Sequence, residues 1–515
     1  MNRLMFFLMC CIWLFITTTV QAQTGGEVEI VQAGSLEGVK RDGVEVRRLI
    51  GDVIFKRDST YLYCDSALFY DETNSIDAYS RVRIVSTTAR INGDFLHYDG
   101  QLSLADITGK KVTLDDGKMQ LTATAIRYDL NAETASYTTG GKVVDKSNVL
   151  TSRKADYFAK QRSVYFKDDV VLVNPDYRIL SDTLRYHPPS QTTYFLGPTW
   201  ISGTTADSVK AYCEFGWYRS NDKKAVFTRN ARVSSKERIL TGDSISYDFK
   251  YGSGLAWENV SIHDTLEKVV ISGGIAGMNE KTGQAWVTRD ALLTRIFDTD
   301  SLFMHADTLR MNNDTLNDKK SYRAYYKVRM FKSDLQAQCD SVAYSTLDST
   351  IWFFRNPVLW GESNQLTADT IGLVLRGDTI SEMRLLGGAF IAGQEDSIRF
   401  NQVKGRRMDG TFIGNRLQTI YVTGNGESVY YLRNSRKQLS GVNAATCSDM
   451  RIRLIGSKVS KIWLLNKPDA VLNPVKDVNP LELRLKGFGW RGNERPQKKE
   501  DIFNWPLDSA ERPAP

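Results

Sequence analysis

The sequence predicts a nearly all-β, solenoid-like protein. Two short sequence patterns, here called phrases, alternate along most of the chain. In both, apolar residues recur at every second position, which is typical of strands. No stretch after the N-terminal segment keeps apolar residues at i, i+3, i+4 and i+7 for three turns, as an amphipathic helix would. Each repeat unit is therefore interpreted as strand, turn, strand.

The first phrase is an apolar residue, any residue and then tyrosine, usually with a small or acidic residue two places before the apolar one. Successive tyrosines lie 28, 30, 58, 61 and 97 residues apart, which are one, one, two, two and three units of roughly 28–33 residues, an interval typical of stacked repeats. Relaxed copies end in methionine or leucine. The full copies are Leu68/Tyr70, Leu96/Tyr98, Ile126/Tyr128, Leu184/Tyr186, Ile245/Tyr247 and Val342/Tyr344, and the relaxed ones are Leu309/Met311 and Ile371/Leu373.

The second phrase falls between copies of the first and joins an aromatic or apolar pair to a β-branched run through a turn residue. Examples are centred on Asp168, Asn230, Asn259 and Asn356. Because Gly, Asn and Asp enter left-handed or turn conformations most cheaply, one per unit predicts a corner or bulge at the same place in every unit.

The first 22 residues predict a cleavable export signal. A short positive start is followed by a mainly apolar stretch from Leu4 to Val20 and by small residues near Ala22. An uncleaved anchor helix is the alternative, but the apolar run is short for a membrane span. No later segment approaches the roughly 18 apolar residues that such a span needs, so the mature chain is expected to be soluble, and the export signal predicts that it lies outside the cytoplasm.

The mature chain is expected to have three parts. Residues 23–45 form a lead-in, residues 46–465 form about a dozen units of ~30 residues, and residues 466–515 form a proline-rich tail. Seven of the chain's 12 prolines lie in that tail, where they would end the ladder of strands. Apolar anchors in the tail suit a segment that docks on a sheet end or on a partner; they are Phe488, Trp490, Ile502, Phe503 and Trp505.

Composition and motifs argue against most kinds of chemistry. The formal charge of +7 is spread along the chain and interleaved with acids, and no nucleic-acid-binding motif is present. We expect no cofactor, no metal and no catalytic residue, because no nucleophile elbow, phosphate loop or zinc-ligand spacing is found. The four cysteines after the export signal are expected to be buried, unpaired small hydrophobes; they are Cys64, Cys213, Cys339 and Cys447.

Aspartates recur two residues before the apolar member of the first phrase. A functional interpretation stacks them as a carboxylate ladder for calcium or glycan chemistry, and a structural one makes each a corner residue whose side chain bonds backbone amides. We favour the corner, because a catalytic pair would occur once and need not repeat. The aspartates are Asp94, Asp182, Asp243, Asp307, Asp340 and Asp369.

The repeated pattern of a small residue, an aspartate and the tyrosine phrase resembles the OstA-like family of periplasmic lipopolysaccharide-transport proteins of the LptA type, here in a long form. The phrases that carry the resemblance begin at Gly93, Ser181 and Gly242, and it runs over roughly residues 46 to 430. The resemblance implies an elongated, repetitive β-jellyroll: antiparallel strands bent into two facing sheets, with an apolar interior that shelters lipid acyl chains. It also implies a bridge protein that carries lipopolysaccharide or lipooligosaccharide toward the outer membrane without catalysis.

If the resemblance holds, the first phrase supplies the candidate groove residues. For each of them an ordinary filled core is an equally good interpretation. The candidates are Leu68, Tyr70, Leu96, Tyr98, Ile126, Tyr128, Leu184, Tyr186, Ile245, Tyr247, Val342 and Tyr344.

The expected partners are lipopolysaccharide or a related glycolipid, and other OstA-like proteins that pair with the exposed edge strands. Two other hypotheses stay open. One is a secreted β-repeat protein that binds or cleaves glycans, which would gather carboxylates and exposed aromatics on one face. The other is a scaffold for outer-membrane assembly that carries no lipid.

Overall fold

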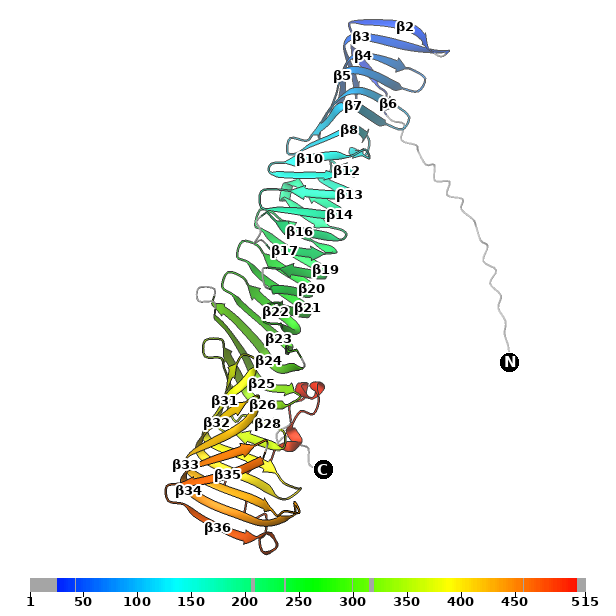
Figure 1. Ribbon diagram of the computed structural model, residues 1–515. Coiled ribbons are helices and arrows are strands. Elements are labelled where there is room, and N and C mark those ends of the chain that lie inside the picture. Colours follow the sequence, from blue (N-terminus) through cyan, green and yellow to red (C-terminus); the bar gives the residue numbers. More distant parts are fainter. Residues whose placement is uncertain are drawn as a thin grey trace, which may run out of the picture. The chain divides into compact units, whose positions relative to one another are not determined.

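The computed structural model describes residues 26–41, 43–204, 209–235, 238–298, 300–314, 319–456 and 458–506 (Figure 1). The predicted export signal lies outside these residues. The described residues form 36 antiparallel β-strands and four short 3-10 helices, which confirms the all-β prediction. None of the described helices is long and apolar enough to cross a membrane.

The chain divides into two compact units, residues 1–168 and 169–515. In each unit most strands pair with their neighbours in sequence, as the predicted repeats require. The strands of the first unit are β1 (Glu29–Gln32), β2 (Ser35–Arg41), β3 (Val44–Arg57), β4 (Thr60–Tyr70), β5 (Ser75–Val85), β6 (Arg90–Asp99), β7 (Leu104–Asp115), β8 (Gln120–Asp129), β9 (Thr134–Tyr137), β10 (Gly141–Asp145), β11 (Asn148–Ser152) and β12 (Lys154–Phe158), and β13 (Ser163–Val173) runs through the boundary.

The second unit holds the remaining strands and the helices. Its elements are β14 (Tyr177–His187), η1 (Pro188–Ser190), β15 (Thr192–Phe195), β16 (Thr199–Gly203), β17 (Lys210–Cys213), β18 (Phe215–Arg219), β19 (Lys224–Ser234), β20 (Arg238–Asp248), β21 (Ser253–Asp264), β22 (Val269–Asn279), β23 (Gln284–Ile296), β24 (Ser301–Asp314), β25 (Lys319–Lys332), β26 (Leu335–Ser345), β27 (Thr350–Phe354), β28 (Val358–Gly361), β29 (Asn364–Thr367), β30 (Thr370–Arg376), β31 (Thr379–Gln394), β32 (Phe400–Ile413), β33 (Arg416–Arg433), β34 (Leu439–Ile455), β35 (Lys458–Leu465), β36 (Asp469–Pro474), η2 (Val475–Asp477), η3 (Gly492–Glu494) and η4 (Lys499–Phe503).

Most long strands bend in the middle, and the predicted turn residues lie at the bends. Asn230 and Asn259 are each the second of two consecutive residues with positive φ, and the pairing register shifts at the same points. The glycine pair Gly387–Gly388 bends β31 in the same way. Since buried side chains lie on both sides of each bend, the sheet is folded along this line into two halves that face each other.

The recurring aspartates hold these bends, which confirms the corner interpretation where their side-chain contacts are defined. Asp94 Oδ2 accepts a hydrogen bond from the backbone amide of Lys110 at 2.8 Å, and Asp243 Oδ2 accepts one from Asn259 Nδ2 at 2.9 Å. Each partner belongs to the bend of the following strand. In these two cases the carboxylate joins neighbouring strands.

The first copy of the tyrosine phrase is displaced by one residue. Asp65 bonds the bend residue Arg81, with 2.7 Å between Oδ1 and Nε, and so takes the corner position that Asp94 takes in β6. Counted from that aspartate, Ala67 and Phe69 point inward, and they are 1% and 6% exposed. At a bend, the set of alternate residues that faces the core switches from odd to even positions or the reverse. The sequence pattern alone does not show at which residue this switch occurs.

The tail continues the sheet and then crosses it. β36 pairs with β34, and the chain beyond it runs back over the outer face of strands from β34 to β24. We call residues 475–503 the strap. Its predicted anchors pack on this face: Phe488 lies 5.0 Å from Phe400 between ring centroids, and Phe503 lies 4.8 Å from His305.

Buried amides fix the strap as firmly as the aromatic rings do. Gln365 donates from Nε2 to the Gly489 carbonyl at 2.7 Å and accepts from the Arg491 amide at 2.7 Å. Gln402 accepts from the Leu485 amide at 2.9 Å. Over strands β24 to β34, one half of the folded sheet is therefore buried on both of its faces. We call it the covered half, and we call the facing half the open half.

Candidate functional site

The second unit contains an apolar cavity of about 930 Å³ between the two halves of the folded sheet. Leu359, Leu366 and Ile391 reach it from the covered half, and Leu309 and Leu373 reach it from the open half. Further apolar side chains complete the lining, and they include Ile271, Leu293, Met304, Met330, Val342, Phe353, Met383, Val403, Ile420 and Ile452. The volume is that of a ligand site, because protein interiors are otherwise packed almost without voids.

The tyrosine phrase differs between the filled interior of the first unit and the strands around the cavity. In the first unit, tyrosines such as Tyr98 and Tyr128 fill the corresponding positions and are almost completely buried. The copies of the phrase in β24 and β30 carry Met311 and Leu373 in place of tyrosine, and Leu373 lines the cavity. Tyr344 of the full copy in β26 lines the cavity as well, so the cavity is lined by both full and relaxed copies of the phrase.

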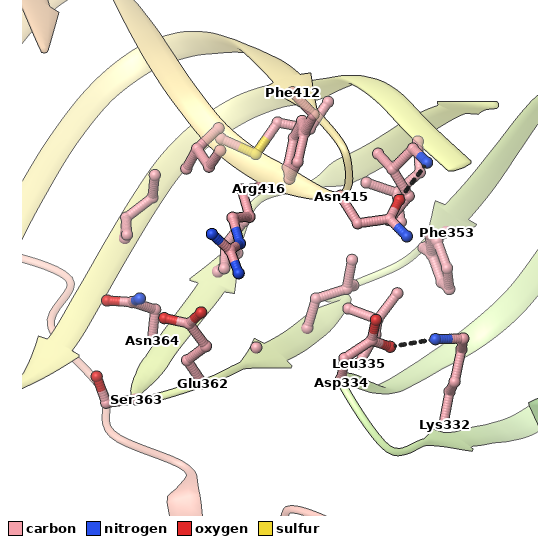
Figure 2. A pocket seen from close by; sticks show the side chains of 18 of the residues that line it. Lys332, Asp334, Leu335, Phe353, Glu362, Ser363, Asn364, Phe412, Asn415 and Arg416 are labelled. Carbon is pink, nitrogen blue, oxygen red and sulfur yellow. Dashed lines mark hydrogen bonds and ion pairs between the residues drawn. The ribbon is translucent and has the colours of Figure 1, made fainter. Parts of the chain in front are cut away.

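Polar side chains from the turns form the mouth of the cavity, as Figure 2 shows. Asp334, Glu362 and Asn364 lie on one side, and Asn415 and Arg416 lie on the other. These residues stand at hairpin tips, where the two halves of the bent sheet end close to each other. The arrangement is amphipathic, with an apolar interior and a charged rim.

Ion pairs and hydrogen bonds position the rim. Asp334 Oδ1 lies 2.6 Å from Lys332 Nζ, and the Asn415 side chain accepts the Ile380 amide at 2.8 Å. Within the described part of the chain, Arg416 has no carboxylate at ion-pair distance, although it faces the mouth. Its guanidinium is therefore available to an anionic group of a ligand.

A buried charge cluster lies beside the far end of the cavity. Lys320 Nζ is 3.5 Å from Asp264 Oδ2 and 3.3 Å from Glu267 Oε1, and Arg238 Nε is 3.9 Å from the same Asp264 oxygen. Burial raises the pKa of the neighbouring Tyr322 hydroxyl above its ordinary value, and the nearby carboxylates raise it further. The cluster is internally compensated and forms a polar end wall.

The twelve candidate groove residues do not all lie together. Val342 and Tyr344 line the large cavity, and Leu96 and Tyr98 line a small one of about 30 Å³ in the first unit. Leu68 and Tyr70 are half-buried, and the Tyr70 hydroxyl donates to Asp77 at 3.0 Å. The other six are buried in the interior and line neither cavity; they are Ile126, Tyr128, Leu184, Tyr186, Ile245 and Tyr247. Their role as groove residues stays a prediction.

The four cysteines are buried and unpaired, as predicted. Burial, together with the nearby Asp65, raises the pKa of the Cys64 thiol to about 12, and burial together with the nearby Glu214 raises the pKa of Cys213 to about 12. Among the described residues, no group of three or more His, Cys, Asp or Glu side chains could hold a metal ion.

Sequence reasoning missed the rim of the cavity. Glu362, Asn364, Asn415 and Arg416 lie in hairpin turns, where polar residues are expected in any case. Nothing in their local sequence distinguishes a rim from an ordinary solvent-exposed turn.

Comparison with known proteins agrees with the predicted family. The model of the OstA-like protein family matches residues 26–182, so over these residues the chain is similar to that family and the predicted resemblance is confirmed there. No curated protein matches the chain in sequence.

A solved structure also aligns with part of the chain. It is that of LptH from Pseudomonas aeruginosa, described as the LptA homologous periplasmic component of the conserved lipopolysaccharide transport device. The alignment has 18% identity, covers 20% of this chain and 79% of that chain, and has a TM-score of 0.19. A TM-score this low does not establish a shared overall fold.

Proposed function

We propose that this chain is a lipid carrier of the lipopolysaccharide-transport type, which holds the acyl chains of lipopolysaccharide, lipooligosaccharide or a related glycolipid in the cavity of the second unit. The observation that carries the proposal is the apolar cavity with its charged rim. The match to the OstA-like family supports the same class of function.

The physical chemistry of the cavity suits an amphiphile. Transfer of each acyl methylene from water to an apolar interior contributes about 0.8 kcal/mol, so a single acyl chain would be held firmly. The headgroup would stay at the rim, where Arg416 can bind a phosphate and the amides of Asn364 and Asn415 can bind sugar hydroxyls. Carriage of a lipid in this way needs no catalytic residue.

The proposed place of action is the periplasm, on the route to the outer membrane. The predicted export signal and the family support this location. Edge strands would connect the chain to other OstA-like proteins, since an unpaired strand edge can accept a further strand. At the C-terminal end β36 carries exposed Val471 and Leu472 beside such an edge.

Site-specific photocrosslinking in cells tests the proposal. A photoreactive residue at Val342 or Leu373, both of which line the cavity, should form a covalent adduct with the glycolipid. The matched controls are Ala343 and Val374, the next residues along the same strands, which point away from the cavity. Adducts of equal yield at cavity and control positions, or no adducts in folded and exported protein, would refute lipid carriage.

The same experiment distinguishes a single cavity from a continuous groove. Leu184 and Ile245 are predicted groove residues whose surroundings are filled. Adducts there as well would mean that the interior opens during transport. Adducts confined to the cavity positions would mean that these residues belong to a closed core.

A further inference from the structure

The open half of the second unit carries a row of aromatic and arginine side chains on its outer face. Residues directly opposite each other on paired strands share one face of a sheet, so the pairing register defines the row. From β23 to β27, Trp286 is opposite Arg310, Arg310 opposite Arg323, Arg323 opposite Ala343, and Ala343 opposite Trp352. The strap covers the other half of the sheet and leaves this face uncovered.

Both tryptophans lie flat on the sheet. Trp286 is opposite Gly277, where an added Cβ would lie 2.5 Å from Cε2 of the indole, and Trp352 is opposite Gly372, where it would lie 2.7 Å from Cζ3. Each ring therefore covers a glycine with one of its faces. The opposite face of each partly exposed indole is left for a flat apolar surface to stack on.

Two arginines lie side by side between the tryptophans, in strand segments that also contribute to the wall of the cavity. Arg310 and Arg323 are both exposed and directly opposite each other, an arrangement that like charges disfavour. Their contacts are with Tyr325: the Arg310 guanidinium lies 5.7 Å from its ring centroid, and Arg323 Nη1 lies 3.4 Å from its hydroxyl. Among the described residues, neither arginine has a carboxylate at ion-pair distance. The pair thus presents uncompensated, fork-shaped donors that match a carboxylate or phosphate.

A parallel row of amides and hydroxyls runs beside these residues, two positions along each strand. Gln284 is opposite Asn312, Asn312 opposite Ser321, and Ser321 opposite Ser345. All four are exposed or half-buried. Amides and hydroxyls can both donate and accept hydrogen bonds, so these side chains can bind sugar hydroxyls.

We propose that this face binds a linear anionic glycan. The two indole faces would stack on the apolar faces of sugar rings, Arg310 and Arg323 would bind acidic substituents between them, and the adjacent row would hydrogen-bond the hydroxyls. The tryptophans are four strand spacings apart, or about 19 Å, which spans several sugar residues. A membrane surface fits less well, because rings that lie flat against the sheet do not project into a bilayer. This inference goes beyond lipid carriage and does not depend on it.

Titration calorimetry of the purified chain with short alginate oligomers tests the proposal, with neutral dextran oligomers of similar length as the comparison. The double variant R310Q/R323Q removes both charges and keeps two polar side chains on the exposed face. It should weaken alginate binding at least tenfold, since each lost charge-assisted bond contributes more than about 1.4 kcal/mol. Binding should also weaken as salt is raised.

Trp352→Phe tests stacking and keeps Gly372 covered by a ring. The control is Trp200→Ala, since Trp200 is 55% exposed and packs against Tyr212, with the two rings tilted by 52°, outside this row. Weaker binding in W352F, unchanged binding in W200A and unchanged thermal melting in both would support the site. No alginate binding, equal binding of dextran, unchanged binding by R310Q/R323Q, or tighter binding of a single-stranded oligonucleotide or phosphatidylglycerol vesicles would overturn it. Lipid crosslinking at Val342 is measured separately, so either proposal can fail without the other.

Discussion

Gln365→Leu should detach the middle of the strap without unfolding the second unit. Gln365 is 3% exposed, and it bonds both the Gly489 carbonyl and the Arg491 amide. Leucine is close to glutamine in size but leaves both backbone groups buried without a partner, and Trp360 Nε1, which donates to Gln365 Oε1 at 3.3 Å, also loses its acceptor. Each unsatisfied group costs about 1–3 kcal/mol, so the two backbone groups together destabilise the attached strap by about 2–6 kcal/mol.

Hydrogen exchange measures this directly. The Arg491 amide should lose protection by about 30-fold or more, because about 1.4 kcal/mol corresponds to a factor of ten. Strands of the first unit should keep their exchange rates. Gln120→Leu is the control, since Gln120 is an exposed glutamine on β8 of the first unit. Unchanged exchange at Arg491, or an equal loss of protection in the first unit, would refute the assignment of Gln365 as an anchor.

Three further predictions concern the interior and the strap end. Leu373→Trp should fill part of the cavity and reduce glycolipid crosslinking at a neighbouring lining position, whereas Val374→Trp on the opposite face should not; equal yields in both variants would count against the cavity as the lipid site. Burial lowers the pKa of His305 below its ordinary 6.5, despite a backbone carbonyl and two aspartates that raise it. The unfolded state then binds more protons, so stability present above pH 6.5 should be lost as the pH falls below it, and chemical unfolding at several pH values should show this loss in the parent but not in His305→Gln. Cys64 and Cys213, with pKa values of about 12, should be only about one part in ten thousand thiolate at pH 8 and should react with a thiol reagent only after unfolding, which a time course of labelling would show.

The strands and bends could be predicted from the sequence because local rules determine them. Period-two alternation indicates strands, and Asn230 and Asn259 have positive φ because such residues accept it most cheaply. The pattern did not determine which residues of the first copy of the tyrosine phrase face the core. Leu68 and Tyr70 fit the phrase of apolar residue, any residue and tyrosine, but Ala67 and Phe69 face the core, in agreement with the bond between Asp65 and the next bend.

The cavity and the strap could not be predicted from local patterns. The same inward parity serves a filled core and an open cavity, and only the combined side-chain volumes of many strands distinguish the two. The strap's anchors were recognisable as apolar residues, but its docking face depends on contacts over long separations. Gln365 and Gly489 are 124 residues apart in the chain.

Because one half of the sheet is covered on both faces and the other half on only one, the two halves of the second unit should differ in stiffness. The covered half is packed on both faces and clamped by the strap, so it resists bending. The open half has one solvated face and can flex on its row of bends. When the cavity enlarges to admit a ligand, the open half should therefore move against a stationary covered half, and the exposed row around Arg310 and Arg323 would move with it. Occupancy of the interior would in that way be transmitted to the outer surface through the thickness of a single sheet.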